Sequence, residues 1–269
     1  MQLRTGDGVS LHVQELGELG ELGELGAHGS GPPVVMLHGL FGNLATWYFT
    51  TGAELAPKHR IITYDLRGHG RSDRVLHGYD VGTMEQDLEA VVDRLIPREP
   101  LTPVIVVGHS YGGVIALAFA LQNPHRTHKL VLVDVPLPPL DTGELWSRFT
   151  KVADPDPAAT LATLPAAVRD AITSGGRRAA RFLETVRFLA VESSLRDDLA
   201  RAEMSDATLA TLACPVLAVY GDASSCRPSG QRLARLAKDV QYIEIPGGHD
   251  LPQEAPLALT HELVRFIDG

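Results

Sequence analysis

The stretch Gly108-His109-Ser110-Tyr111-Gly112-Gly113 decides the fold that this sequence predicts. It follows the apolar run 104–107, which is typical of a buried strand, and it leads into the helix-forming run 114–120. A serine at a strand-to-helix turn, with glycines two residues to either side, matches the nucleophile motif G-x-S-x-G. Side chains at the two glycines would collide with the neighbouring strand and helix, and the strained turn lifts the serine hydroxyl clear of the sheet. We therefore predict that Ser110 is a nucleophile beside helix N–H groups that suit an oxyanion.

Two further segments place functional turns at strand ends. The run Pro33–Leu37 is typical of a second buried strand, and it ends in the glycine-containing turn His38-Gly39-Leu40-Phe41-Gly42-Asn43. Such a turn can direct backbone N–H groups at the space over the nucleophile, where the N–H of Tyr111 supplies the other half of an oxyanion hole. Near the far end, the run Val240–Ile245 predicts the last strand, and the loop after it presents a single histidine, His249.

These segments, together with Asp65-Leu66-Arg67-Gly68-His69-Gly70-Arg71-Ser72 after the fourth predicted strand, come in a characteristic order. In that order the chain resembles α/β-hydrolase fold enzymes over almost all of its length. The resemblance implies an α/β fold with a mostly parallel central sheet, helices on both faces and a helical lid inserted after the sixth strand. It also implies that Ser110 is the nucleophile, that His249 is the general base, and that the amides of Leu40 and Tyr111 form the oxyanion hole.

The acid of the catalytic triad is where the chain departs from the commonest family pattern, Gly-x-x-Asp after the seventh strand. Here the strand 215–220 is followed by Gly221-Asp222-Ala223-Ser224, and Ser224 cannot carry the charge that stabilises an imidazolium. Asp222 lies two residues early. Asp134 ends the sixth predicted strand, where some haloalkane dehalogenases and fungal lactonases hold their acid. We favour Asp134 over Asp222 as the acid, although a strand-end aspartate is also common as a turn cap.

Composition and length favour one domain over residues 1–269. Strands and helices alternate without a linker, and 44% of the residues are hydrophobic, which is ample for a core. No apolar run approaches the roughly 18 residues that a membrane span needs. The first residues lack the apolar stretch of a signal peptide, so we predict a cytoplasmic location.

Charge and motif content exclude several classes of partner and cofactor. The net charge of −9 disfavours nucleic acid and anionic membranes. Cys214 and Cys226 are the two cysteines, and neither they nor the scattered histidines have metal-ligand spacing. There is no phosphate-binding glycine motif after the first strands. We therefore predict a small-molecule substrate, no cofactor and no metal.

The segment from about 137 to 211 separates the sixth and seventh predicted strands, and it is too long for a single crossover helix. In the family this place holds the lid. Apolar residues recur in it at helical spacing, while prolines and glycines divide it into several helices. Residues 141–206 contain nine Arg or Lys and eleven Asp or Glu, so no basic patch is indicated. We expect an apolar pocket, with Trp146 and Phe149 facing the substrate.

The sequence Glu-Leu-Gly repeats four times over residues 15–26. A three-residue period matches neither a helix nor a strand, and glycine at every third position opposes both. We interpret the repeat as an expanded surface loop with no chemistry of its own.

The resulting hypothesis is acyl transfer to water, acting on a small or medium-sized apolar ester or lactone. Carbon–carbon bond hydrolysis of β-diketones and cofactor-free perhydrolysis use the same triad and stay open as alternatives. So does a ligand-binding homologue with low turnover. A serine at position 110 excludes the branches that use an aspartate nucleophile.

Overall fold

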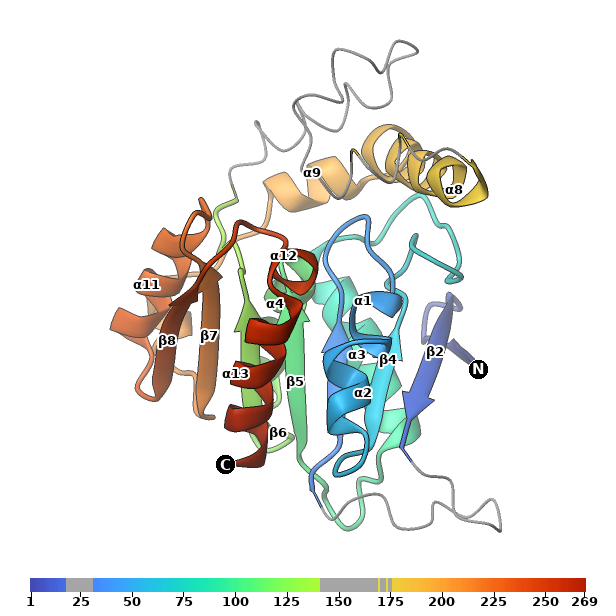
Figure 1. Cartoon of the computed structure of the whole chain (residues 1–269). Helices are drawn as coiled ribbons and strands as arrows, with labels where there is room; N and C mark the ends of the chain where they lie inside the picture. The colour runs from blue at the N-terminus through green and yellow to red at the C-terminus, as the bar shows by residue number, and fades with distance from the viewer. Residues whose placement is uncertain (18–30, 141–168, 170–172, 174–175) are drawn as a thin grey trace.

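A computed structural model describes residues 1–17, 31–140, 169, 173 and 176–269 (Figure 1). The described strands form one eight-stranded sheet in the order β1-β2-β4-β3-β5-β6-β7-β8. They are β1 (Gln2–Arg4), β2 (Ser10–Leu16), β3 (Val34–Leu37), β4 (Ile61–Tyr64), β5 (Val104–His109), β6 (Thr127–Val133), β7 (Val216–Gly221) and β8 (Val240–Ile245). The pairs β1–β2 and β2–β4 are antiparallel, and the other pairs are parallel. The prediction of a mostly parallel α/β sheet is therefore confirmed.

Helices cover both faces of this sheet, which is why its central strands are apolar throughout rather than alternating. Side chains of β5 alternate between two cores: Val106 packs with α3 and α4 on one face, and Val107 packs with α13 on the other. The helices are α1 (Ala45–Tyr48), α2 (Thr51–Leu55), α3 (Val81–Leu95), α4 (Tyr111–Gln122), α11 (Arg227–Leu236), α12 (Leu251–Glu254) and α13 (Pro256–Asp268). None of the described helices is both long enough and apolar enough to cross a membrane.

Between β6 and β7 the described residues form α8 (Gly176–Arg187), the π-helix η1 (Phe188–Glu192), α9 (Leu195–Ala200) and α10 (Asp206–Leu209). Helical spacing in this segment was expected from its apolar residues, and Val186 and Leu189 are indeed fully buried. Figure 1 shows α8 and α9 lying across one end of the sheet. The segment is held there by the loop after β4, because Asp198 accepts from the N–H of Tyr79 and the N–H of Ser194 donates to the carbonyl of Leu76.

Some predicted features lie outside the described residues. They include Trp146, Phe149, the three prolines 155, 157 and 165 of the same segment, and most of the Glu-Leu-Gly repeat. The lid over about 137–211 and the single domain over 1–269 therefore stay predictions.

A buried ion pair ties the loop after β4 to α3. Arg67 in that loop is 2% exposed, and its Nε and one terminal nitrogen each lie 2.6 Å from a carboxylate oxygen of Asp87 in α3. Both groups of this bidentate pair are withdrawn from water, so Asp87 depends on Arg67 for its compensating charge, and Arg67 has in addition only the exposed carboxylate of Asp7 at 3.1 Å. The pair fixes the loop that carries Gly68, His69 and Gly70 below α8 and η1.

We expect Asp87→Ala to lower the free energy of unfolding by up to about 3–5 kcal/mol, because it leaves the buried Arg67 guanidinium with only the exposed carboxylate of Asp7 as a counter-charge. Denaturant unfolding followed by circular dichroism measures the change. The matched control is Glu184→Ala, which removes an exposed partner of Arg74 and should cost about 0–1 kcal/mol. Equal losses in the two variants would contradict the role given to the buried pair.

Candidate active site

Ser110 occupies a strained turn between β5 and α4. Its φ of 52° and ψ of −124° are unusual for a residue with a side chain. The two flanking glycines are required by space, as the sequence predicts: a Cβ at Gly108 would lie 2.4 Å from the carbonyl oxygen of Gly112, and a Cβ at Gly112 would lie 2.3 Å from that of His38. The hydroxyl of Ser110 is thereby held above the carboxyl end of the sheet.

His249 reaches this hydroxyl from the loop after β8. Its Nε2 lies 2.9 Å from Oγ of Ser110, and its side chain is 45% exposed. The loop is held by His109, whose Nε2 lies 2.9 Å from the carbonyl oxygen of His249. Burial lowers the pKa of His109 to about 3, so the ring is neutral at pH 7 and its N–H donates to that carbonyl.

Asp134, and not Asp222, lies beside the imidazole. Its Oδ1 is 3.1 Å from Nδ1 of His249, and its side chain is fully buried at the end of β6. Its Oδ2 accepts from the N–H of Gly221 at 2.9 Å. Asp222 is exposed instead and accepts from the N–H of Gly247, so it holds the turn before His249 without contacting the ring. The structure thus brings together the three predicted residues Ser110, His249 and Asp134.

Sequence reasoning missed three residues near this group, of which Cys226, 3.5 Å from Nδ1 of His249, is one. Ser224, recognised only as a residue that cannot be the acid, donates its hydroxyl to Oδ1 of Asp134 at 2.6 Å. It thereby stabilises a carboxylate that comes from the neighbouring strand. A further missed residue is His109, whose one sequence signal is its place directly before Ser110 in the motif.

The predicted oxyanion-hole residues belong to two turns next to Ser110. Tyr111 is the first residue of α4, so its N–H has no acceptor within the helix. Leu40 follows Gly39, at which a Cβ would lie 3.0 Å from Cβ of Ser110. The turn is held by His69, whose Nε2 accepts from the N–H of Phe41 at 3.0 Å. Burial lowers the pKa of His69 to about 3, which keeps Nε2 available as an acceptor.

The charge on His249 is set by its partners. Desolvation lowers the pKa of His249, but the hydrogen bond to Asp134, and after it the contact with Cys226, raise the pKa by more, so that it lies above its ordinary value of 6.5. The arrangement therefore favours an imidazolium. The imidazolium forms when the neutral ring takes the proton of Ser110, and Asp134 balances the charge of the ring in that state.

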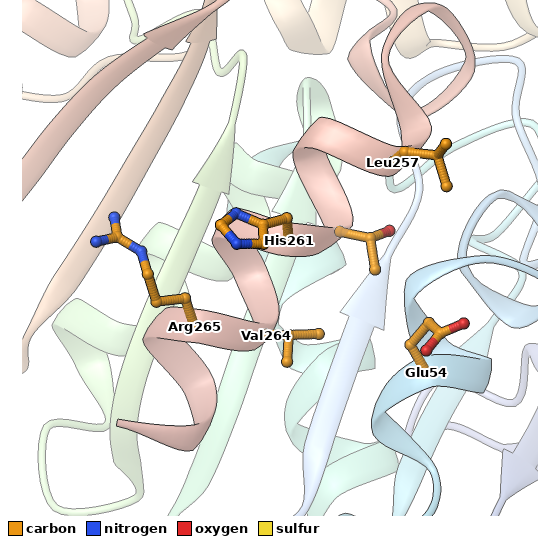
Figure 2. Close-up of a pocket in the computed structure, with 6 residues that line it drawn as sticks. Glu54, Leu257, His261, Val264 and Arg265 are labelled. Atoms are coloured by element: carbon orange, nitrogen blue, oxygen red, sulfur yellow. The ribbon is translucent and has the colours of Figure 1, made fainter.

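A separate hollow of about 420 Å³ lies between α2 and α13, and Figure 2 shows its lining residues. Glu54, Leu257 and Val264 are among them, and Leu257 is largely exposed. His261 and Arg265 both pair with Glu262 on the same helix. The hollow contains no nucleophile with a base beside it, so its chemistry does not compete with that of the Ser110 group.

Comparison with known proteins agrees with this geometry. A family model described as alpha/beta hydrolase fold matches residues 32–187, more than half of the chain. The chain belongs to the α/β-hydrolase fold family. The prediction of a hydrolase of this family is thereby confirmed, whereas its substrate is a separate question.

Relatives and solved structures extend the likeness to the whole chain. The chain is 32% identical over 255 residues to "Putative carbamate hydrolase RutD" of Variovorax paradoxus, covering 89% of this chain and 94% of that protein. The structure of an esterase, RhEst1, of Rhodococcus matches with a TM-score of 0.74 at 25% identity over 100% of this chain and 98% of that one. An enol-lactonase of Burkholderia xenovorans matches with a TM-score of 0.74 at 22% identity, covering all of both chains, and shows the fold alone. The match to uncharacterized proteins of Mycobacterium, at 38% identity, spans 39% of this chain and 29% of theirs.

Asp134→Asn should lower the pKa of His249 by about 1–3 pH units, because it removes the negative charge that favours the imidazolium. Titration of the imidazole by NMR measures this pKa. Asp222→Asn is the matched control and should leave the pKa of His249 nearly unchanged, since its carboxylate contacts the backbone of Gly247. An equal fall in both variants would contradict the assignment of Asp134 as the partner of the ring.

Proposed function

We propose that the chain is a serine hydrolase that cleaves a small or medium-sized, uncharged ester or lactone through an acyl-enzyme on Ser110. One observation carries the proposal: Oγ of Ser110 lies 2.9 Å from Nε2 of His249, whose Nδ1 lies 3.1 Å from a buried carboxylate of Asp134. Acyl transfer requires a nucleophile in contact with a base, and that base in contact with an acid that orients it; these three residues have that geometry.

In the proposed mechanism His249 takes the proton of Ser110 as its oxygen attacks the acyl carbon. The N–H groups of Leu40 and Tyr111 then stabilise the oxyanion. His249 returns the proton to the leaving alcohol, and the acyl group stays on Ser110. Water, activated by the same imidazole, releases the acid in a second step, while Asp134 keeps Nδ1 protonated and the ring in one orientation.

The substrate class rests on the segment between β6 and β7 and on the relatives. That segment has no excess of positive charge, which disfavours phosphorylated or coenzyme A substrates. Relatives of the same fold include an esterase and an enol-lactonase, and a relative matched over most of its length is named for carbamate hydrolysis. Carbamates therefore join esters and lactones among the substrates to test. A cytoplasmic location stays a prediction from the sequence.

Labelling by a fluorophosphonate probe should identify Ser110 as the nucleophile. The wild-type chain is expected to label. Ser110→Ala is expected to lose labelling and nearly all hydrolysis. Binding and the oxyanion hole should leave it a rate about 10³–10⁴-fold above that of the uncatalysed reaction. Ser224→Ala is the control and should still label, because the Ser224 hydroxyl is bonded to Asp134 and is not the group that the probe modifies. Labelling that survives Ser110→Ala, or a rate above about a tenth of wild type in that variant, would contradict the acyl-enzyme.

A substrate screen tests the acyl group. Rates on p-nitrophenyl esters of increasing chain length, lactones, carbamates and β-diketones should show kcat/KM highest for an uncharged ester or lactone, because the predicted pocket is apolar. Highest activity on an acyl-coenzyme A or a phosphorylated ester would contradict the proposed substrate class. Turnover of β-diketones alone would assign carbon–carbon bond hydrolysis to the same triad. Probe labelling without turnover of any class would favour the ligand-binding alternative.

A further inference from the structure

A third side chain stands on the far side of the His249 ring from Ser110. Sγ of Cys226 lies 3.5 Å from Nδ1 of His249, the same nitrogen that lies 3.1 Å from Oδ1 of Asp134. A thiol, an imidazole and a carboxylate thus converge, with one potential ligand atom of each within 4.8 Å of the others. Within the part of the chain that the structure describes, no other three His, Cys, Asp or Glu residues meet in this way.

The turn between β7 and α11 builds this convergence. Cys226 directly precedes α11, and its N–H donates to Oγ of Ser224 at 3.0 Å. Ser224 in turn donates to Asp134. The thiol is therefore placed beside the carboxylate by the same hydrogen bonds that orient the carboxylate. Sequence spacing does not reveal the group, because the three residues are far apart in the chain.

Two of the three separations between ligand atoms suit a tetrahedral divalent cation, and the third is within 4.8 Å. Zinc binds cysteine sulfur, histidine nitrogen and carboxylate oxygen at about 2.0–2.3 Å, so tetrahedral angles separate such ligand atoms by about 3.3–3.6 Å. The nitrogen–oxygen and nitrogen–sulfur separations of 3.1 and 3.5 Å are close to these values. The donor set also selects among cations, since a thiolate with an imidazole favours zinc over magnesium or calcium.

We propose that Asp134, Cys226 and His249 form a Zn²⁺ site that switches the hydrolase off. The ion would take the place of the proton between Nδ1 of His249 and Asp134, with water as the fourth ligand. Solvent reaches two of the three side chains, because the His249 side chain is 45% exposed and Cys226 is half-buried, whereas Asp134 is buried. The net charge of −9 further favours the approach of a cation.

The proton balance explains the inhibition. Zinc needs the lone pair of Nδ1 and a thiolate on Cys226, so the thiol proton leaves to solvent. If the ring is neutral, its proton moves from Nδ1 to Nε2. If the ring is an imidazolium, it loses the Nδ1 proton to solvent and keeps the one on Nε2. In both cases Nε2 holds a hydrogen and donates to Ser110 rather than accepting from it. The base is thereby lost while the substrate side of Ser110 stays clear.

Metal binding itself is tested without any assay of hydrolysis. Cobalt(II), a coloured substitute for zinc, should give a thiolate-to-metal charge-transfer band with the wild-type chain, and zinc should displace it. Cys226→Ser should remove the band. Cys214→Ser is the matched control. The Cys214 thiol is buried just before the first residue of β7, at the opposite end of that strand from Cys226, so this variant should keep the band. Ser110→Ala should keep it as well, since Ser110 is not a ligand. A wild-type chain without the band, or a band that survives Cys226→Ser, would overturn the site.

The effect on rate rests on the proposed serine mechanism, and kinetics test it separately. Zinc should lower kcat with little change in KM, because the ion lies on the Nδ1 side of the ring and the substrate on the Nε2 side. Each variant is compared with its own rate in chelator. In Cys226→Ser and Cys226→Ala the half-inhibitory zinc concentration should rise at least about 10–100-fold, since even loss of a residue that only supports a ligand costs that much affinity. Equal inhibition of Cys226→Ser and wild type, or a purely competitive effect, would overturn the switch. A cobalt band together with a chain that hydrolyses nothing would instead refute the proposed function and leave the metal site standing.

Discussion

The parallel register of β5, β6, β7 and β8 is the constraint on which the site depends. His109 pairs with Val133, so the residues that follow them, Ser110 and Asp134, leave adjacent strands at the same edge of the sheet. The register continues through β7 to β8, so the loop of His249 begins beside the end of β7. A shift of one strand by one residue would turn every side chain to the other face and separate the group.

At that edge of the sheet, strained backbone and buried polar side chains together fix the positions of the site residues. Ser110 and Asp134 both have positive φ, 52° and 48°, in a backbone region that residues with side chains rarely adopt. Such conformations persist only where surrounding contacts determine them. Here the N–H of Ser110 donates to the carbonyl of Val133, and the N–H of Asp134 donates to that of Val219. Nearby, the buried neutral rings of His109 and His69 bond to the backbone of the His249 loop and of the Leu40 turn. These rings act as fixed polar supports, because burial keeps them uncharged at neutral pH.

The acid of the triad follows β6 here and not β7, the commonest position in the family, and this changes what surrounds the imidazole. With serine at position 224, the turn after β7 contributes a hydroxyl that donates to Asp134 rather than a second carboxylate that would repel it. The same turn then brings Cys226 to Nδ1 of His249. The nitrogen that holds the ring in its working tautomer is therefore also the one exposed to a competing ligand.

The sequence by itself determined the central strands, their order along the chain and the segments that carry chemistry. Apolar runs predicted β3 and β5, because buried parallel strands can be recognised without knowledge of their partners. The strand β8, at the half-exposed edge of the sheet, matched its predicted bounds Val240–Ile245. Glycine spacing similarly singled out Ser110, since steric demands of the turn are local. The choice between Asp134 and Asp222 was different: both follow strands, and the sequence could only favour one. Only the tertiary structure decided which carboxylate lies beside His249, and only it revealed Cys226 there. Register and side-chain direction at a strand end depend on contacts between segments far apart in the chain, and these leave no local pattern.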